Sequence, residues 1–78
     1  MIKDNLSKEI GAWLAEQRNE KQMTQAEVGK KLGVTKTGIH YWETGKRDIS
    51  ADMLLKYCEA VDADLMLFIE IQKKKRVR

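Results

Sequence analysis

The sequence predicts a small, mainly α-helical domain, and three observations support this class. The 78 residues include no proline, the residue that most disrupts a helix. Residues of high helix propensity, above all Lys, Glu, Leu and Ala, are frequent. Apolar residues recur at spacings of three and four, as they do on one face of a helix. A chain of this length supports one modest core, so we expect a single compact domain that is stabilised further by a dimer interface.

A first helix is predicted from Asp4 or Asn5, either of which can cap it, to about Lys21. Its buried stripe is formed by Leu6, Ile10, Trp13 and Leu14. Because these residues repeat at helical spacing, we interpret Trp13 as a core residue rather than as part of a ligand site.

Residues 24–43 predict two short helices joined by a tight turn. Thr24 and Glu27 have the spacing of a capping box at the start of the first of them. Gly33 can end that helix in a left-handed conformation, and Thr35 can cap the next one. The arrangement is therefore a helix, a turn and a helix facing one core.

A loop with Gly45 follows, and Ser50 then caps a further helix. The buried stripe of that helix comprises Met53, Leu54, Tyr57, Cys58 and Val61. Cys58 has no base or metal-ligand partner nearby in the sequence, so we interpret it as a small core residue.

The helix-turn-helix segment resembles that of the lambda repressor/Cro-like (Xre) family of DNA-binding proteins. The residues that carry the resemblance are Gln25, Gly29, Gly33, Ile39, Trp42, Glu43, Gly45 and Lys46. It extends over roughly residues 6–62 and implies a compact four-helix DNA-binding domain, which we assign to residues 1–63. In this family the second helix of the motif lies in the major groove of double-stranded DNA.

The resemblance also implies roles for individual residues. Those expected to contact base edges are Lys36, Thr37, His40 and Tyr41. Those expected to contact phosphates are Gln25, Thr35, Thr44, Lys46 and Arg47. An arginine at the position of Arg18 pairs in this family with the glutamate that ends the recognition helix, which is Glu43 here. A guanidinium can hold a partly buried carboxylate through two parallel hydrogen bonds.

The charge distribution agrees with an acidic partner. The formal net charge is +3, but the last six residues carry five positive charges, so residues 1–72 have a net charge of −2. Residues 30–47 nevertheless hold five basic groups and one acidic group. Nucleic acid is the partner that such a basic segment favours, because cations that neutralise phosphates release counterions.

The C-terminal segment, residues 64–72, predicts a β-strand with a fifth helix as the alternative. It contains the apolar run LMLFIEI, whose outer part alternates between apolar and polar residues. A single strand needs a partner for its backbone groups, so we expect it to pair with its twin in a homodimer. The predicted dimer contacts are Leu65, Leu67, Phe68, Ile69 and Ile71. Residues 73–78 are predicted to be a flexible basic tail, either solvated or bound to phosphate.

The sequence favours no enzymatic function. It contains one His and one Cys, and it shows no nucleophile–base arrangement, phosphate-binding loop or metal-ligand cluster. We therefore expect no cofactor and no metal. The single Cys58 cannot form an intramolecular disulfide, and no apolar run is long enough to span a membrane, so a cytoplasmic protein without membrane contact is expected.

Three functions are compatible with these features. The first is a repressor-type transcriptional regulator that binds a pseudo-palindromic operator as a homodimer. The second is an antitoxin that regulates its own operon and binds a toxin protein. The third is a protein-interaction module that keeps the fold but no longer binds DNA. The groove-facing Lys36 and the basic loop favour the first two over the third.

Overall fold

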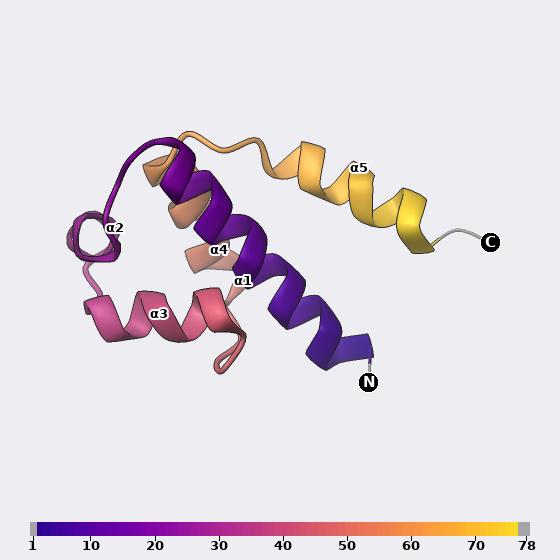
Figure 1. Cartoon of the computed structure of the whole chain (residues 1–78), viewed down its shortest axis with the longest axis horizontal. Helices are drawn as coiled ribbons and strands as arrows, with labels where there is room; N and C mark the ends of the chain where they lie inside the picture. Colours follow the sequence, from indigo (N-terminus) through magenta and orange to yellow (C-terminus); the bar gives the residue numbers. More distant parts are fainter. Residues whose placement is uncertain (1, 77–78) are drawn as a thin grey trace.

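The computed structural model describes the backbone of residues 2–76 and the side chains of residues 6–75, and these residues form five helices joined by short loops (Figure 1). The helices are α1 (Ile2–Glu20), α2 (Gln25–Leu32), α3 (Lys36–Thr44), α4 (Ala51–Ala60) and α5 (Leu65–Arg76). α1 begins at Ile2, before the predicted caps Asp4 and Asn5, which lie within the helix. The predicted mainly α-helical class is confirmed.

The predicted caps of the three middle helices are confirmed. Thr24 accepts a hydrogen bond from the Glu27 N–H at 3.0 Å, and the Glu27 side chain accepts one from the Thr24 N–H at 2.7 Å, which completes a capping box. The hydroxyls of Thr35 and Ser50 cap α3 and α4 by accepting hydrogen bonds from the N–H groups of Gly38 (3.0 Å) and Met53 (3.1 Å). Gly45 ends α3 with a φ of 76°, a left-handed conformation in which a Cβ is unfavourable. Local chemistry thus accounts for where these helices begin and end.

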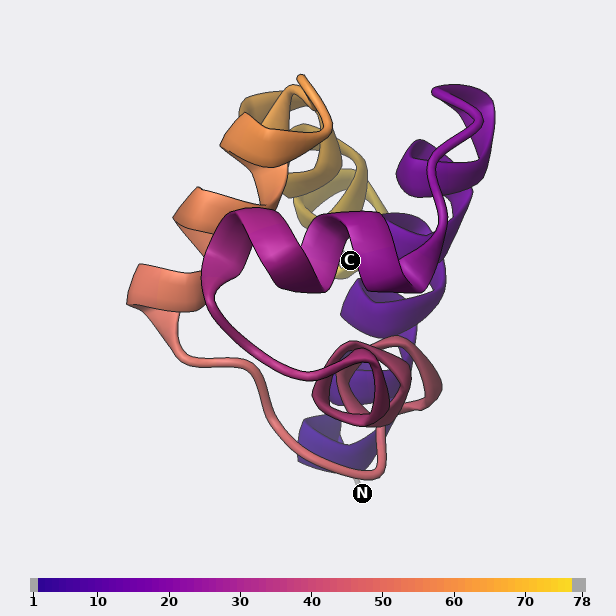
Figure 2. The same ribbon diagram turned by 90° about the vertical axis from the view of Figure 1, so that its left-hand side faces the viewer.

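The core lies between α1, α2, α3 and α4. Its fully or nearly buried members are Leu14, Val28, Ile39, Tyr57, Cys58 and Val61. α2 and α3 cross steeply, since α2 is seen end-on in Figure 1 and α3 is seen end-on in Figure 2. This crossing leaves one side of α3 away from the core.

α1 and α3 approach one another unusually closely at Gly11. A Cβ at this position would clash with the backbone carbonyl oxygens of Trp42 and Glu43. Gly11 is buried within α1, where glycine costs about 1 kcal/mol of helix propensity relative to alanine. The glycine therefore permits α3 to pack its last turn directly against α1.

The predicted C-terminal strand is wrong, and the alternative fifth helix is what the structure contains. Asp64 begins it, because its Oδ1 accepts hydrogen bonds from the N–H groups of Met66 (3.0 Å) and Leu67 (3.4 Å). Phe68 is buried and packs on Trp13 of α1 with ring centroids 4.9 Å apart. α5 runs antiparallel to α1 from this contact, and Lys75 reaches Glu9 at 3.4 Å near its other end.

A helix has an advantage over a strand here because its backbone hydrogen bonds form within one segment and require no second chain. Its N–H and C=O groups pair within the segment, whereas a lone strand would leave them without partners. Leu65, Phe68 and Gln72 then share the face toward α1, while Leu67, Ile69 and Ile71 are exposed. Of the five predicted dimer contacts, Leu65 and Phe68 therefore lie on the inner side of this helix rather than on its exposed side.

The basic tail also begins differently from the prediction. Residues 73–76 continue α5, and Lys73 lies 3.8 Å from Glu70 one turn earlier. Residues 77–78 of the predicted tail lie outside the described residues.

Candidate nucleic-acid interface

A buried carboxylate holds the end of α3 against α1. Glu43 is only 8% exposed. Arg18 donates from Nε to Glu43 Oε2 at 2.7 Å and from an Nη to Oε1 at 2.9 Å. Arg18 also donates to the Met23 carbonyl at 2.8 Å, which ties the α1–α2 connection to the same site. The sequence predicted this pair from the family resemblance, and the geometry is the bidentate one that gives Arg–carboxylate pairs their directionality.

Two further side chains complete the surroundings of Glu43. The amide of Gln25, the first residue of α2, donates to Oε1 at 2.9 Å. The hydroxyl of Tyr57 on α4 donates to Oε2 and lies 3.3 Å from the Leu14 carbonyl. Four helices thus meet at one carboxylate, and we call Arg18, Gln25, Glu43 and Tyr57 the Glu43 network.

The network shifts the pKa of each of its three ionisable members, Arg18, Glu43 and Tyr57. Burial by itself raises the pKa of Glu43, but the hydrogen bonds from Arg18, Tyr57 and Gln25 outweigh it and hold the pKa below its ordinary value. The hydrogen bond with Glu43 raises the pKa of Arg18. Burial and the neighbouring carboxylate raise the pKa of Tyr57 far above its ordinary value. Glu43 is therefore ionised and Tyr57 is neutral at neutral pH.

The opposite side of α3 is open. Lys36, Thr37 and His40 are exposed, while Tyr41 is half-buried. The four residues predicted to read bases therefore lie on the first two turns of α3, and Ile39 between them points into the core. His40 Nδ1 lies 3.5 Å from the Gln25 amide nitrogen, so this surface touches the edge of the Glu43 network.

Two of the predicted phosphate contacts already use their hydroxyl groups within α3. Thr35 Oγ1 accepts the capping hydrogen bond from the Gly38 N–H, which leaves its own proton available for a further acceptor. Thr44 donates its proton to the His40 carbonyl at 2.9 Å. Because a phosphate oxygen only accepts hydrogen bonds, the Thr44 hydroxyl would have to rotate before it could bind one.

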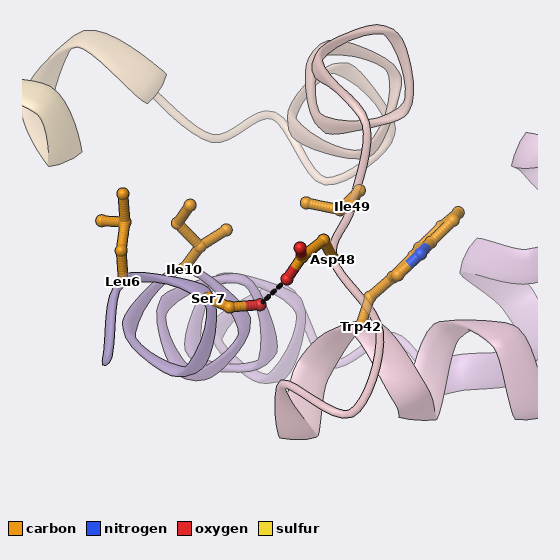
Figure 3. A pocket seen from close by; sticks show the side chains of 6 residues that line it. All are labelled: Leu6, Ser7, Ile10, Trp42, Asp48 and Ile49. Carbon is orange, nitrogen blue, oxygen red and sulfur yellow. Dashed lines mark hydrogen bonds between the residues drawn. The ribbon is translucent and has the colours of Figure 1, made fainter. Parts of the chain in front are cut away.

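The loop between α3 and α4 carries two further predicted phosphate contacts, the cations Lys46 and Arg47, and both are exposed. Lys46 Nζ lies 5.7 Å and Arg47 Cζ 5.5 Å from the centroid of the Tyr41 ring. The far side of the loop is tied to α1, where Ser7 donates to Asp48 Oδ1 at 2.6 Å beside an open hollow of about 230 Å³ (Figure 3). The loop is thus held at both ends.

The structure gives two residues importance that the sequence did not reveal. Tyr57 was predicted as a core residue only, although a buried tyrosine needs a partner for its hydroxyl, and that partner is Glu43. Gly11 was not singled out, although a glycine inside a helix signals either a weakness or a close approach. Neither sequence signal identifies the group that the residue contacts. For Tyr57 that group is Glu43, 14 residues away in the chain.

Among residues 2–76, no group of three or more His, Cys, Asp or Glu residues could hold a metal ion. No helix in this part of the chain is long and apolar enough to cross a membrane.

Comparisons with known proteins identify the family. Residues 14–68 match the model of a helix-turn-helix family, HTH_3. Because the match covers more than half of the chain, the protein belongs to this family of lambda repressor-like DNA-binding transcription regulators. The crystal structure of the clp gene regulator ClgR from C. glutamicum is similar, with a TM-score of 0.80 and 22% identity over 92% of this chain and 94% of that chain. At this identity the likeness shows a shared fold. A comparison with curated proteins found no match.

Proposed function

We propose that this helix-turn-helix protein is a repressor-type regulator that binds a pseudo-palindromic operator as a homodimer. The observation that carries the proposal is the two-sided construction of α3. One side is locked to three other helices through Glu43, and the other exposes Lys36, Thr37 and His40. A helix held this rigidly can place side chains against base edges without a large loss of entropy on binding.

Base reading would use the first two turns of α3. Lys36 can donate to O6 and N7 of guanine, and Thr37 can offer its methyl group to thymine or its hydroxyl to other base edges. His40 and the hydroxyl of Tyr41, one turn further along, would extend the contact. Gly38 between them carries no side chain that could keep α3 away from the groove.

Phosphate binding would frame this surface on both sides. On one side, the backbone N–H of Gln25 lies at the start of α2, where free N–H groups and the helix dipole favour an anion. Thr35, the N-cap of α3, keeps a hydroxyl proton available. On the other side, Thr44, Lys46 and Arg47 follow α3. Such contacts set the orientation on the duplex without reading its sequence.

The exposed face of α5 supports the dimer in its corrected, helical form. Met66, Leu67, Ile69 and Ile71 are 60%, 56%, 38% and 43% exposed. Beside them an apolar groove runs between α5, α1 and α4, lined by Leu6, Ile10, Leu54, Leu65, Phe68 and Ile69. The buried Oε1 of Gln72, at the edge of this groove, accepts no hydrogen bond from the described residues.

A second copy of the chain would cover this surface through a twofold axis. Two recognition helices related in this way must lie about 34 Å apart to enter successive major grooves, which is why a pseudo-palindromic operator is expected. Bound there, the dimer would act by occupying the DNA.

The decisive experiment is selection of binding sites from random duplexes, followed by affinity measurements with two variants. We expect Lys36→Ala to weaken binding of the selected site by about 1–3 kcal/mol and to relax the preference at one position of each half-site. Lys46→Ala should weaken all sequences alike and lower the salt slope by about one unit per site.

Lys56→Ala is the matched control, because Lys56 is an exposed lysine on α4 that pairs with the neighbouring Asp52. It should bind like the wild type. If Lys36→Ala retains both the selected motif and the affinity, the assignment of α3 to the groove is wrong. A stoichiometric protein that co-purifies from the native host would instead favour the antitoxin alternative.

A further inference from the structure

The aromatic ring of Tyr41 lies between the recognition helix and the basic loop. Its centroid is 5.7 Å from Lys46 Nζ and 5.5 Å from Arg47 Cζ, both within the range in which a cation is attracted to the face of an aromatic ring. The backbone reinforces the arrangement, since the Arg47 N–H donates to the Tyr41 carbonyl at 3.2 Å. One residue of α3 thus holds both the backbone and the charged ends of the loop.

The position of the Tyr41 ring counteracts two effects that disfavour phosphate binding by Lys46 and Arg47. Lys46 and Arg47 are adjacent like charges that repel one another, and their long side chains lose rotamer entropy when they are immobilised on a phosphate. A shared aromatic ring attracts both cations and restricts their rotamers before DNA arrives. It leaves N–H groups available, because an ammonium has three donors and a guanidinium has five.

We propose that the Tyr41 ring is a positioning platform that presents Lys46 and Arg47 to the DNA backbone. The inference rests on the proposed DNA binding and deepens it, because it separates two roles within one side chain. The ring would raise the affinity for DNA of any sequence, whereas the hydroxyl is the group that could read a base.

The neighbouring structure keeps the platform in place. Gly45 turns the chain at the end of α3 with a φ of 76°, and the Ser7–Asp48 hydrogen bond fixes the far side of the loop (Figure 3). Because the loop backbone is held at both ends, the side chains of Lys46 and Arg47 are the part of the loop that can still change conformation. The Tyr41 ring restricts these side chains.

Two substitutions separate the ring from the hydroxyl. Tyr41→Leu removes the ring, and Tyr41→Phe keeps it. We expect Tyr41→Leu to weaken binding of the selected duplex and of an unrelated duplex by the same factor, about 5- to 20-fold, because two long side chains would then lose their rotamer freedom only on binding. The salt slope should stay that of the wild type, because both cations remain to bind phosphates. Tyr41→Phe should retain the affinity for the unrelated duplex within about twofold.

Coupling to the loop is the control that a general folding defect would not reproduce. In a Lys46→Ala, Arg47→Ala background, Tyr41→Leu should cause no further loss of affinity for the unrelated duplex. Thermal midpoints of all variants should match those of their parents. An undiminished effect of Tyr41→Leu in that background, or a Tyr41→Leu single variant that binds as tightly as or more tightly than the wild type, would overturn the platform.

A measurement without DNA keeps this inference separate from the proposed function. Proton NMR should show the side-chain methylene resonances of Lys46 and Arg47 shifted upfield by the ring current of Tyr41, and the shift should disappear in Tyr41→Leu. Lys30, an exposed lysine of α2, supplies the unshifted reference. If the shift is present but no duplex is bound, the proposed function fails while the platform geometry holds; if the shift is absent, the platform is wrong.

Discussion

The Glu43 network and the outer face of α5 differ in which side chains they bury and which they expose. In the network, charged groups are buried, and Glu43 receives hydrogen bonds from three other helices. On α5, large apolar side chains are exposed, with Leu67 at 56% and Met66 at 60%. Each arrangement is costly in isolation, because a buried charge loses its hydration and an exposed apolar face contacts water.

The difference indicates which part of the molecule is complete as a single chain. The side chains that donate hydrogen bonds to Glu43 belong to the same chain, so α3 is held in place by contacts within that chain. The exposed face of α5 and the buried Gln72 Oε1 find no such partner among the described residues. Under the proposed function, the first region supplies rigidity and the second supplies assembly.

The largest effect is expected for Glu43→Ala. It leaves Arg18 and Tyr57 facing a site without a carboxylate, and removal of one member of a buried ion pair costs about 3–5 kcal/mol. Urea unfolding without DNA measures the loss. Asp52→Ala is the control, because Asp52 and its partner Lys56 are mostly exposed and such a pair contributes about 0.5 kcal/mol or less. Equal stability of Glu43→Ala and the wild type would contradict the buried network.

A somewhat smaller effect is expected when Leu67 is replaced by Glu. The substitution places a charge in each copy of the proposed interface and should weaken the dimer by about 2–4 kcal/mol in total. Sedimentation at micromolar concentration should show a monomer whose thermal unfolding remains cooperative. Leu55→Glu is the matched control, since Leu55 is 60% exposed but lies on α4. A Leu67→Glu variant that remains fully dimeric would exclude this face of α5 as the interface.

Tyr57→Phe tests the network more gently. It removes one hydrogen bond to an ionised acceptor and retains the buried ring, so we expect a loss of about 1–2 kcal/mol in the free energy of unfolding. Tyr41→Phe removes a hydroxyl from a half-buried ring outside the network and should have no measurable effect on stability. If the two variants are equally stable, the Tyr57 hydroxyl contributes nothing to holding α3.

The pH dependence of stability gives the smallest and most specific test. The pKa of Glu43 is lower in the folded chain than its ordinary value of 4.5, so the unfolded chain binds the proton more readily. The contribution of Glu43 is therefore fully present above about pH 4.5 and is lost as the pH falls through the lower folded-state pKa. Between pH 5 and pH 3, the wild type should lose more stability than Glu43→Gln, whose side chain does not titrate. Parallel curves would show that Glu43 is not stabilised in its charged form.

Sequence signals of short range predicted much of the fold. Thr24, Thr35 and Ser50 cap the helices they were expected to cap, because a cap and its acceptor or donor are only three residues apart. The outward residues of α3 follow from the same short-range logic, since Ile39 marks the buried side and Lys36, Thr37 and His40 lie around it. The pairing of Arg18 with Glu43 came from the family resemblance, not from periodicity.

The C-terminal segment shows where short-range signals are insufficient. The run LMLFIEI suits either a strand or a helix by composition. Two contacts decide for the helix: the Asp64 cap, and Phe68 packed on Trp13, a residue 55 positions earlier in the chain. Tyr57 illustrates the same point, because its need for a polar partner is evident from the sequence but the identity of that partner is not.

Helix limits, the amphipathic pattern and the outward side of α3 are thus properties of neighbouring residues, and they are present in the sequence before the chain folds. The conformation of α5, the closure of the Glu43 network and the close approach at Gly11 depend on groups that come together only when the helices pack. The physical reason is that backbone hydrogen bonds and caps are satisfied locally, whereas a buried charge and an apolar face are stabilised or destabilised by whatever lies opposite them.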